Sequence, residues 1–544
     1  MSIETAAPTR REWFGLIAIS AGVALIVVDL TIVNVIVAPI INDLKITSTQ
    51  AQWIQESYAI VFAALLLVAG RLCDLHGARR IFLTGLTVFA ATSVLAAAAP
   101  DGELLIAARF LQGIGGALIL PASLALVNTT FQGKARAQAF AVWGSTIGAA
   151  AAVGPLLGGW LADFSWRWAF GVNLPLVILI AAAVLSYLPA SARIPGQVDI
   201  PDALLSMAGL GLLSFGLIEG RSHGWLLVTE PWRIAGFDWN AGPSPVLVAF
   251  AVAALALIVF WRRQVAASRA GVQPLLDVRL FGIGSFRRGN VVTLIIGIGE
   301  FGIIAVLPLW LQFTLGYTAL QAGLALVPLA VGSFCASGAS FSLAASVSAL
   351  GQVRIGLVLE AIGLVLLGAC AAVDSPWWPI ALALFVYGIG VGFATAQVTN
   401  IVLADVPPVR AGQASGIQST ARELGSALGI ALLTTVFFSL LESGLRERLT
   451  DAGVSDPDAH ELSAAVTDSA GVMVPDLAAD PATSAAAHAA GTAMTTGIAW
   501  SSYICAALLM AALAATLFVT PTRKPESSDP ASEGASAEPG GATR

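Results

Sequence analysis

Charged side chains are scarce in this sequence. Asp, Glu, Lys and Arg make up only 11% of its 544 residues, and 57% of the residues are hydrophobic. About 25% of the residues of an ordinary soluble domain are charged. The composition therefore excludes a soluble globular protein and predicts a chain embedded in the lipid bilayer.

Cysteine is also rare, and the residue patterns typical of enzymes are missing. Four cysteines lie in or beside apolar runs, without the close spacing of metal ligands, at Cys73, Cys335, Cys370 and Cys505. The sequence has neither a phosphate-binding loop nor a nucleophile motif. We expect packing thiols, no metal, no cofactor, no nucleic-acid partner and no enzymatic activity.

Long apolar segments are frequent instead. A helix needs roughly 20 mostly apolar residues to cross the hydrocarbon core, and fourteen segments of the sequence meet this requirement. The fold class that follows is an all-α polytopic membrane protein. The expected spans are 13–37, 52–70, 81–99, 104–128, 138–162, 169–188, 202–219, 245–261, 289–314, 321–345, 353–373, 378–403, 413–440 and 498–520.

The distribution of basic residues predicts the orientation. Most of the 27 Lys and Arg residues fall on one side of the membrane if the N-terminus is cytoplasmic. Basic loops tend to remain in the cytoplasm, so we expect both termini there. The acidic segment 442–497 then faces outward, where its composition fits either surface helices or disorder. The tail 521–544 has a disordered composition.

Two carboxylates lie deep inside expected spans. Asp29 is in the first span and Glu300 in the ninth. A charge at the centre of the bilayer costs about 2.5–3.5 kcal/mol on insertion scales, so an intramembrane acid is a candidate functional residue. We expect both acids to exchange protons and to contact substrate, and we expect Glu300 to face the central cavity. A neutral or paired packing acid is the alternative for Glu300.

Four further acids lie nearer the ends of spans. Glu56 is expected near the outer end of its helix, where it would face a vestibule and take part in proton coupling. The other three are more simply explained by structure. Glu360 and Glu423 have basic neighbours, Arg354 and Arg422, and Glu219 is expected to reach the outer interface.

One arginine, Arg109, lies within an expected span. Its guanidinium does not lose its proton, and a buried cation without a partner is costly. We therefore expect Arg109 to influence the protonation of Asp29 or of another acid in the cavity.

Four aromatic residues are candidates for a cavity that binds lipophilic compounds through stacking and cation–π contacts. Packing or interface anchoring is the alternative for each of them. They are Trp53, Trp143, Phe301 and Trp310.

The turn GRLCDLHGARR, residues 70–80, combines glycines that permit a tight turn with charged residues at the membrane surface. It resembles the signature that follows the second helix in the major facilitator superfamily. The resemblance implies two six-helix bundles, here with two inserted helices, and a cytoplasmic latch that holds the outward-facing state. The latch residues would be Gly70, Asp74, Gly77, Arg79 and Arg80.

Internal similarity agrees with two related halves. Residues 70–81 resemble 342–355, and the sequence around Arg109 has a distant counterpart around Arg422. Such repeats are typical of transporters that work by alternating access. The expected organisation is an N-terminal bundle (1–188), a linker region with two helices (189–288), a C-terminal bundle (289–520) and the tail (521–544).

Further stretches are similar to the 14-helix drug:proton antiporters of that superfamily. They are VDLTIVNV (28–35), RFLQGIGGA (109–117), GPLLGG (154–159), WRWAFGVNLP (166–175) and QFTLGYTALQAG (312–323). In that family the arginine corresponding to Arg109 is implicated in proton coupling.

Gly-Pro kinks a helix, and paired glycines permit close approach of a neighbouring helix. Packing alone would explain the seam formed by Gly154, Pro155, Gly158 and Gly159. The resemblance implies that this seam favours exchange over symport.

The expected function is proton-coupled efflux of lipophilic, often cationic drugs across a bacterial plasma membrane. The partners are a small-molecule substrate and the bilayer, protons are the coupling ion, and a monomer is favoured. The alternatives are a dedicated exporter of one antibiotic, lipid or siderophore, and a membrane sensor that kept the fold and lost transport.

Overall fold

The computed structural model describes residues 8–229, 232–234, 237–343 and 346–517, so the tail 521–544 lies outside the described residues. Within these ranges, fourteen helical segments are long and apolar enough to cross a membrane, which confirms the expected number. The membrane helices are α1 (Arg10–Leu44), α2 (Ser48–His76), α3 (Ala78–Ala97), α4 (Gly102–Thr130), α5 (Gly133–Ala162), α6 (Arg167–Gly171) with α7 (Asn173–Tyr187), α8 (Ile200–His223), α9 (Pro245–Arg269), α10 (Gly284–Phe313), α11 (Ala319–Ala325) with α12 (Val327–Leu343), α13 (Ala349–Cys370), α14 (Trp377–Ala404), α15 (Ala411–Asp451) and α18 (Ser484–Thr516).

Short elements connect the membrane helices. The strands β1 (Trp232–Ile234) and β2 (Phe237–Trp239) form an antiparallel hairpin between α8 and α9. Two 3₁₀ turns, η1 (Val278–Gly282) and η2 (Pro408–Arg410), precede α10 and α15, and the short helices α16 (Asp456–Asp468) and α17 (Val474–Ala479) lie between α15 and α18.

Local signals fix where many helices begin. Thr9 forms a capping box with Glu12 at the start of α1, and Thr47 forms another with Gln50 at the start of α2. These side chains satisfy backbone N–H groups that a helix leaves without partners at its first turn. Gly77 has φ +89° between α2 and α3, a conformation that favours glycine, so the tight turn is explained by this residue.

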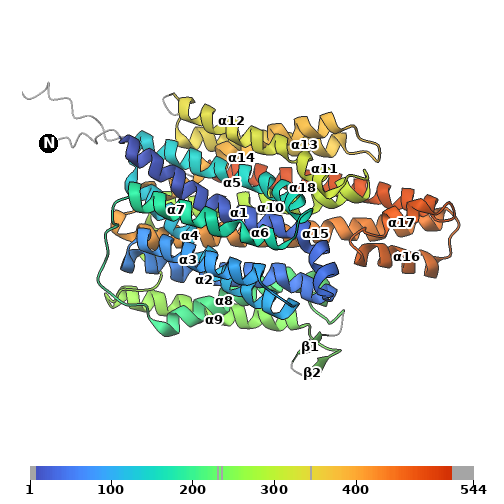
Figure 1. The fold of residues 1–544 in the computed structure, drawn as a ribbon, viewed down its shortest axis with the longest axis horizontal. Helices are drawn as coiled ribbons and strands as arrows, with labels where there is room; N and C mark the ends of the chain where they lie inside the picture. Colours follow the sequence, from blue (N-terminus) through green and yellow to red (C-terminus); the bar gives the residue numbers. More distant parts are fainter. Residues whose placement is uncertain (1–7, 230–231, 235–236, 344–345, 518–544) are drawn as a thin grey trace, which may run out of the picture.

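The helices pack in two similar sets (Figure 1). In the N-terminal set α1 packs on α5 and α4 packs on α2 and α3; in the C-terminal set α10 packs on α15 and α14 packs on α12 and α13. The sets meet where α15 contacts α2 and where α5 contacts α12 and α14. By this correspondence α15 is the counterpart of α5, so the similarity around Arg109, on α4, and Arg422, on α15, does not reflect the repeat.

The inserted helices lie along one side of this assembly. α8 packs against α2 and α15, and α9 packs on α8, which places α8 where the two sets meet.

The segment 442–497, called the projection below, is helical. It contains the last turns of α15, then α16 and α17, and the start of α18, and it extends beyond the other helices in Figure 1. The buried leucines Leu441, Leu445 and Leu449 recur every four residues on α15. This spacing gives one apolar helix face and extends α15 past its expected end at residue 440.

An ion pair closes the turn between α15 and α16. The carboxylate of Asp456 lies 2.8 Å from the guanidinium of Arg446. The hydrogen bond from Arg446, with its positive charge, lowers the pKa of Asp456 below its usual value.

Replacing the buried Leu445 with Ala tests whether packing holds the projection together. The lost burial and the cavity cost about 2–5 kcal/mol, so limited proteolysis of the purified protein is expected to cut within 442–483 faster than in wild type. The control Leu445→Met conserves volume and costs under about 1.5 kcal/mol. Equal cleavage rates for Leu445→Ala and wild type would show that the leucine face does not hold the projection.

Candidate functional site

A cavity of about 520 Å³ lies between the two sets of helices and is called the vestibule. It opens at the end of the bundle opposite the turn 70–80. Its lining comes from α1, α2, α4, α8, α10 and α15, and Ala470 of the projection also contributes. The polar and aromatic lining residues include Gln52, Gln55, Glu56, Arg109, Ser214, Arg221, Ser222, Trp225, Glu423, Ser426, Thr434 and Phe438.

A buried ion pair joins α1 to α4 at the wall of the vestibule. Asp29 and Arg109 are each only 1% exposed, and one carboxylate oxygen of Asp29 accepts a hydrogen bond from the Arg109 guanidinium. Arg109 also donates to the Ile54 carbonyl at 3.1 Å, and its charge lies 4.5 Å from the centre of the Tyr58 ring. The structure therefore brings together the two residues that the sequence paired.

Three polar residues complete this network, and none of them was predicted from the sequence. Gln112 and Asn173 donate to the second carboxylate oxygen of Asp29 at 3.0 and 3.1 Å, and both also contact the Ser93 hydroxyl. Both lie inside the quoted stretches RFLQGIGGA and WRWAFGVNLP. The sequence signal that could have identified them is a polar side chain within an apolar run. Such a side chain is energetically costly in lipid unless it has a hydrogen-bond partner.

The stretch that supplies Asn173 also anchors the end of α1. Trp166 donates its indole N–H to Asp43 at 2.9 Å, and the Arg167 guanidinium pairs with the same carboxylate. These hydrogen bonds, that from Arg167 first, hold the pKa of Asp43 below its usual value.

The deep acid of the C-terminal set has its own partners. Glu300, on α10, accepts hydrogen bonds from Thr395 on α14 and, at 3.3 Å, from Arg422 on α15. Its side chain is buried, and it is not among the residues that line the vestibule. The expectation that Glu300 faces the central cavity is therefore wrong for this conformation, because its carboxylate turns toward α14 and α15.

Of the three acids assigned to structural roles, Glu360 differs from expectation and Glu219 is buried. Glu360 is fully buried, and neither of its carboxyl oxygens has a hydrogen-bond partner among the described residues. Its expected partner Arg354 instead contacts Thr516 at 3.1 and 3.2 Å. Glu219 is only 2% exposed, and its carboxylate lies 3.0 Å from Nδ1 of His223.

The four predicted aromatic residues are not among those that line the vestibule. Trp143 is buried and donates to Ser123 at 3.1 Å, and Trp310 is buried and donates to Thr495 at 3.0 Å. Trp53 stacks on Phe215, and the Phe301 ring lies 5.6 Å from the Arg422 charge. Their contacts are those of packing residues, whereas Trp225 and Phe438 supply the aromatic lining.

The latch turn 70–80 binds the N-terminus of α15. Both carboxylate oxygens of Asp74 accept backbone hydrogen bonds, from Gly412 at 2.7 Å and from Gln413 at 2.9 Å. The first N–H groups of a helix carry partial positive charge and favour an anion. A Cβ on Gly70 would lie 2.6 Å from the Gly412 carbonyl, so glycine is needed for this close approach.

The remaining latch residues fasten the turn to its surroundings. Arg79 donates from its backbone to Ser191 at 3.1 Å and from its guanidinium to the Leu185 carbonyl at 2.8 Å, while Arg80 is exposed. At the same end Arg136 on α5 donates to Asn400 on α14 at 3.1 Å. At the latch end the two helix sets are thus joined at two places, between α2 and α15 and between α5 and α14.

The glycine seam formed by Gly154, Pro155, Gly158 and Gly159 contacts α1 beside Asp29. A Cβ on Gly154 would lie 1.8 Å from the Thr31 hydroxyl oxygen, and one on Gly158 would lie 2.9 Å from Ile32. Gly159 has more room, since its nearest atom would be Leu320 at 3.7 Å, and Pro155 contacts Gly323. The seam therefore presses α5 against the helix that carries the buried carboxylate.

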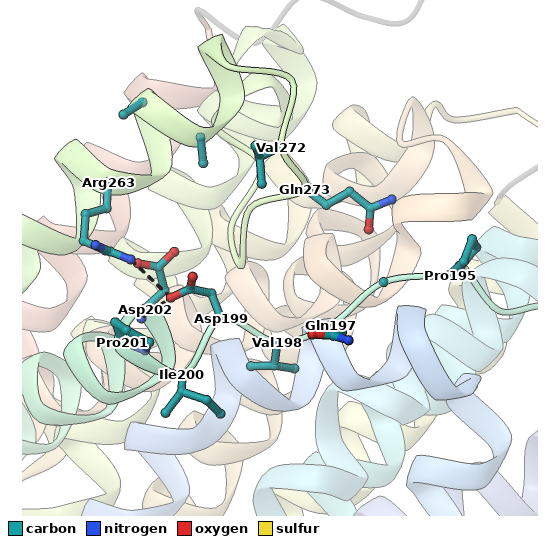
Figure 2. A pocket seen from close by; sticks show the side chains of 13 residues that line it. Pro195, Gln197, Val198, Asp199, Ile200, Pro201, Asp202, Arg263, Val272 and Gln273 are labelled. Atoms are coloured by element: carbon teal, nitrogen blue, oxygen red, sulfur yellow. Dashed lines mark hydrogen bonds and ion pairs between the residues drawn. The ribbon is translucent and has the colours of Figure 1, made fainter.

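A second hollow, of about 680 Å³, lies at the latch end between the connection to α8 and the end of α9. Figure 2 shows Arg263 of α9 reaching Asp199 and Asp202 at the start of α8, with distances of 3.2 and 2.5 Å. These pairs fasten the two inserted helices together, and the hollow does not connect to Asp29 or Arg109.

A model of the major facilitator superfamily matches residues 19–430. The chain belongs to the major facilitator superfamily. Its relatives identify the branch as the drug:proton antiporter family. The multidrug efflux pump LfrA of Mycolicibacterium smegmatis is 31% identical over 94% of this chain and 96% of its own. The probable actinorhodin transporter of Streptomyces coelicolor is 33% identical over 80% of this chain and 74% of its own.

Solved structures of the superfamily share the fold. The human organic anion transporter MFSD10 superposes with a TM-score of 0.56 at 15% identity, covering 92% of this chain and 99% of its own. With fourteen apolar helices in its described residues, this major facilitator is a multi-pass protein of the plasma membrane.

Gly154→Ala is expected to impair this transporter because the new methyl group would overlap the Thr31 hydroxyl. Overpacking of this kind costs about 1–3 kcal/mol, so we expect a lower melting temperature and slower transport. Gly159→Ala adds the same methyl group where space exists and is the matched control. If both variants melt and transport like wild type, the seam is not tightly packed.

Asp74→Asn is expected to weaken the latch because it removes the charge that faces the α15 N-terminus. Charge-assisted hydrogen bonds contribute about 1.5–3 kcal/mol, so the open population at the latch end should rise about tenfold or more. Spin labels at the exposed positions Thr84 and Val409 report this as a longer distance. Asp43→Asn, at the opposite end of the bundle, should leave the distance unchanged. An unchanged distribution in Asp74→Asn would refute the latch.

Proposed function

We propose that this major facilitator is a proton-coupled exporter of lipophilic, often cationic small molecules that works by alternating access. The carrying observation is the buried Asp29–Arg109 pair in the wall of a vestibule that is closed at its other end by Asp74. Protons are the coupling ion, and no other cofactor is needed. The latch end is assigned to the cytoplasm, which makes this conformation outward-facing and places both termini inside.

The ion pair supplies a proton-dependent contact between helices. When a proton from the vestibule neutralises Asp29, the carboxyl group loses most of its attraction for Arg109, which also lines the vestibule. A cation bound near Arg109 is then repelled more strongly, and it leaves outward. Loss of the proton to the cytoplasm restores the pair, and each charge that moves inward gains about 2.3 kcal/mol per 100 mV.

The vestibule suits amphipathic cations. Glu56 and Glu423 offer negative charge, while Trp225, Phe438 and Leu309 offer apolar surface. Aromatic faces attract organic cations as well as apolar groups, so one cavity accepts chemically different compounds. We assign Glu300 to a second proton site in the C-terminal set, where Arg422 contacts it directly.

A dedicated exporter of one antibiotic is the second candidate. Two relatives support it by name: the actinorhodin transporter and the puromycin resistance protein of Streptomyces alboniger, which is 33% identical over 87% of this chain. A panel of substrates separates the two candidates, because a dedicated exporter moves one chemical class only.

Transport in vesicles with an imposed pH gradient tests the proposal. Purified protein is expected to move tetraphenylphosphonium only with the gradient, and added tetraphenylphosphonium should stimulate proton flux. Asp29→Asn should reduce gradient-driven transport at least tenfold, because the titrating group is lost. Asp43→Asn removes an exposed acid from the same helix and should transport normally. The proposal is overturned if wild-type transport does not depend on the pH gradient. It is also overturned if Asp29→Asn transports like wild type.

A further inference from the structure

The inserted helix α8 forms part of the vestibule wall. Ser214, Leu217, Ile218 and Arg221 from α8 line the cavity, as does Trp225 just after it. The helix is held against α2 by a run of stacked rings, with Trp53 on Phe215 and Phe215 on Trp232. A helix that only connected two bundles would not need to line the cavity between them.

Two carboxyl groups meet where α8 packs on α2. Glu56 is 8% exposed and Glu219 is 2% exposed. The Gln52 side-chain nitrogen lies 2.6 Å from a Glu56 oxygen and 3.4 Å from a Glu219 oxygen. The same Glu219 oxygen lies 3.0 Å from Nδ1 of His223, one turn along α8.

One carboxylate oxygen of this pair of acids lacks a hydrogen-bond partner among the described residues. Oε2 of Glu56 is buried, and it has no hydrogen-bond partner in the part of the chain that the structure describes. Glu56 is among the residues that line the vestibule, so this buried oxygen lies at the cavity wall, where a proton would supply the missing partner. A buried polar atom without a partner is expensive, so its presence at a cavity wall indicates a binding role.

A basic side chain contacts one of the two acids, since His223 lies 3.0 Å from Glu219. Three other charged groups line the vestibule: Arg109 on α4, Arg221 on α8 and Glu423 on α15. Arg109 pairs with Asp29, and the Arg221 charge lies 4.1 Å from the Phe438 ring. Two carboxylates that share one amide donor repel each other, so the pair favours holding a proton or a cation.

We propose that Glu56, Glu219 and His223 form a cation-exchange site in which a substrate ammonium or phosphonium and a proton compete for the same carboxyl pair. This inference rests on the proposed function and deepens it, since it assigns the substrate charge to a site built by an inserted helix. When a proton from vestibule water binds Oε2 of Glu56, the carboxylate becomes a neutral acid and the cation leaves. When the cation binds, the O–H bond breaks and the proton returns to water. His223 tunes the exchange through its contact with Glu219, which becomes an ion pair when the imidazole is protonated.

Binding of tetraphenylphosphonium to the purified full-length protein in weakly buffered solution tests the site. Wild type is expected to release protons as the cation binds. Glu219→Gln should release fewer protons per cation and bind tetraphenylphosphonium about tenfold more weakly. His223→Asn should shift the pH dependence of binding. The neutral antibiotic chloramphenicol, measured in parallel, should bind these variants as it binds wild type.

The matched control is Asp199→Asn, which removes an exposed acid at the start of α8 and keeps a good helix cap. It should bind and release protons like wild type. Equal affinity and equal proton release in Glu219→Gln and wild type would overturn the inference and leave the Asp29 mechanism intact. Absence of proton release in wild type itself would instead count against the proposed function. If Glu219→Gln does not fold, as judged by its melting curve, an unchanged pH dependence in His223→Asn overturns the site.

Discussion

The ion pair between Asp29 and Arg109 is the interaction on which the N-terminal set depends. In lipid, a charge is tolerated only when protein groups replace the water that would solvate it. Here α1 supplies the anion, α4 the cation and Gln112, and α7 supplies Asn173. The glycines of α5 then allow that helix to close over the same turn of α1. Four helices are therefore positioned by the solvation of one carboxylate.

The two sets treat their buried acids differently. Asp29 has a hydrogen-bond partner on both oxygens, whereas the C-terminal set holds Glu300 beside Arg422 and leaves both oxygens of Glu360 without a partner among the described residues. An unpartnered acid is inexpensive only while it is neutral. The N-terminal set thus surrounds its deep acid with donors, and the C-terminal set leaves one of its acids without them, so the repeat in fold does not extend to the hydrogen-bonding of the buried acids.

The fold could be predicted from the sequence because the bilayer constrains the length and polarity of each segment that crosses it. Apolar length gave the number of helices, and depth within a span identified Asp29 and Arg109, which the structure pairs. The positions of the aromatic candidates were predicted less well. A tryptophan such as Trp310 can donate its indole N–H equally well in a packed helix interface or in the wall of a cavity. The contact between Glu219 and Gln52 could not be predicted from the sequence, because Gln52 lies on another helix and only the tertiary fold brings the two together. The projection was underestimated because its helices are held by a leucine face rather than by an apolar run.

The length of α15 has a mechanical consequence. This single helix of 41 residues begins at the latch, passes the vestibule at Glu423 and ends in the projection. At about 1.5 Å per residue it is a rod of roughly 60 Å. If Asp74 releases the first turn of α15 and the helix tilts, the other end of α15, in the projection, must move as well. The projection would therefore move together with the latch end, and a binder that held the projection would hold the protein in one state without entering its cavity.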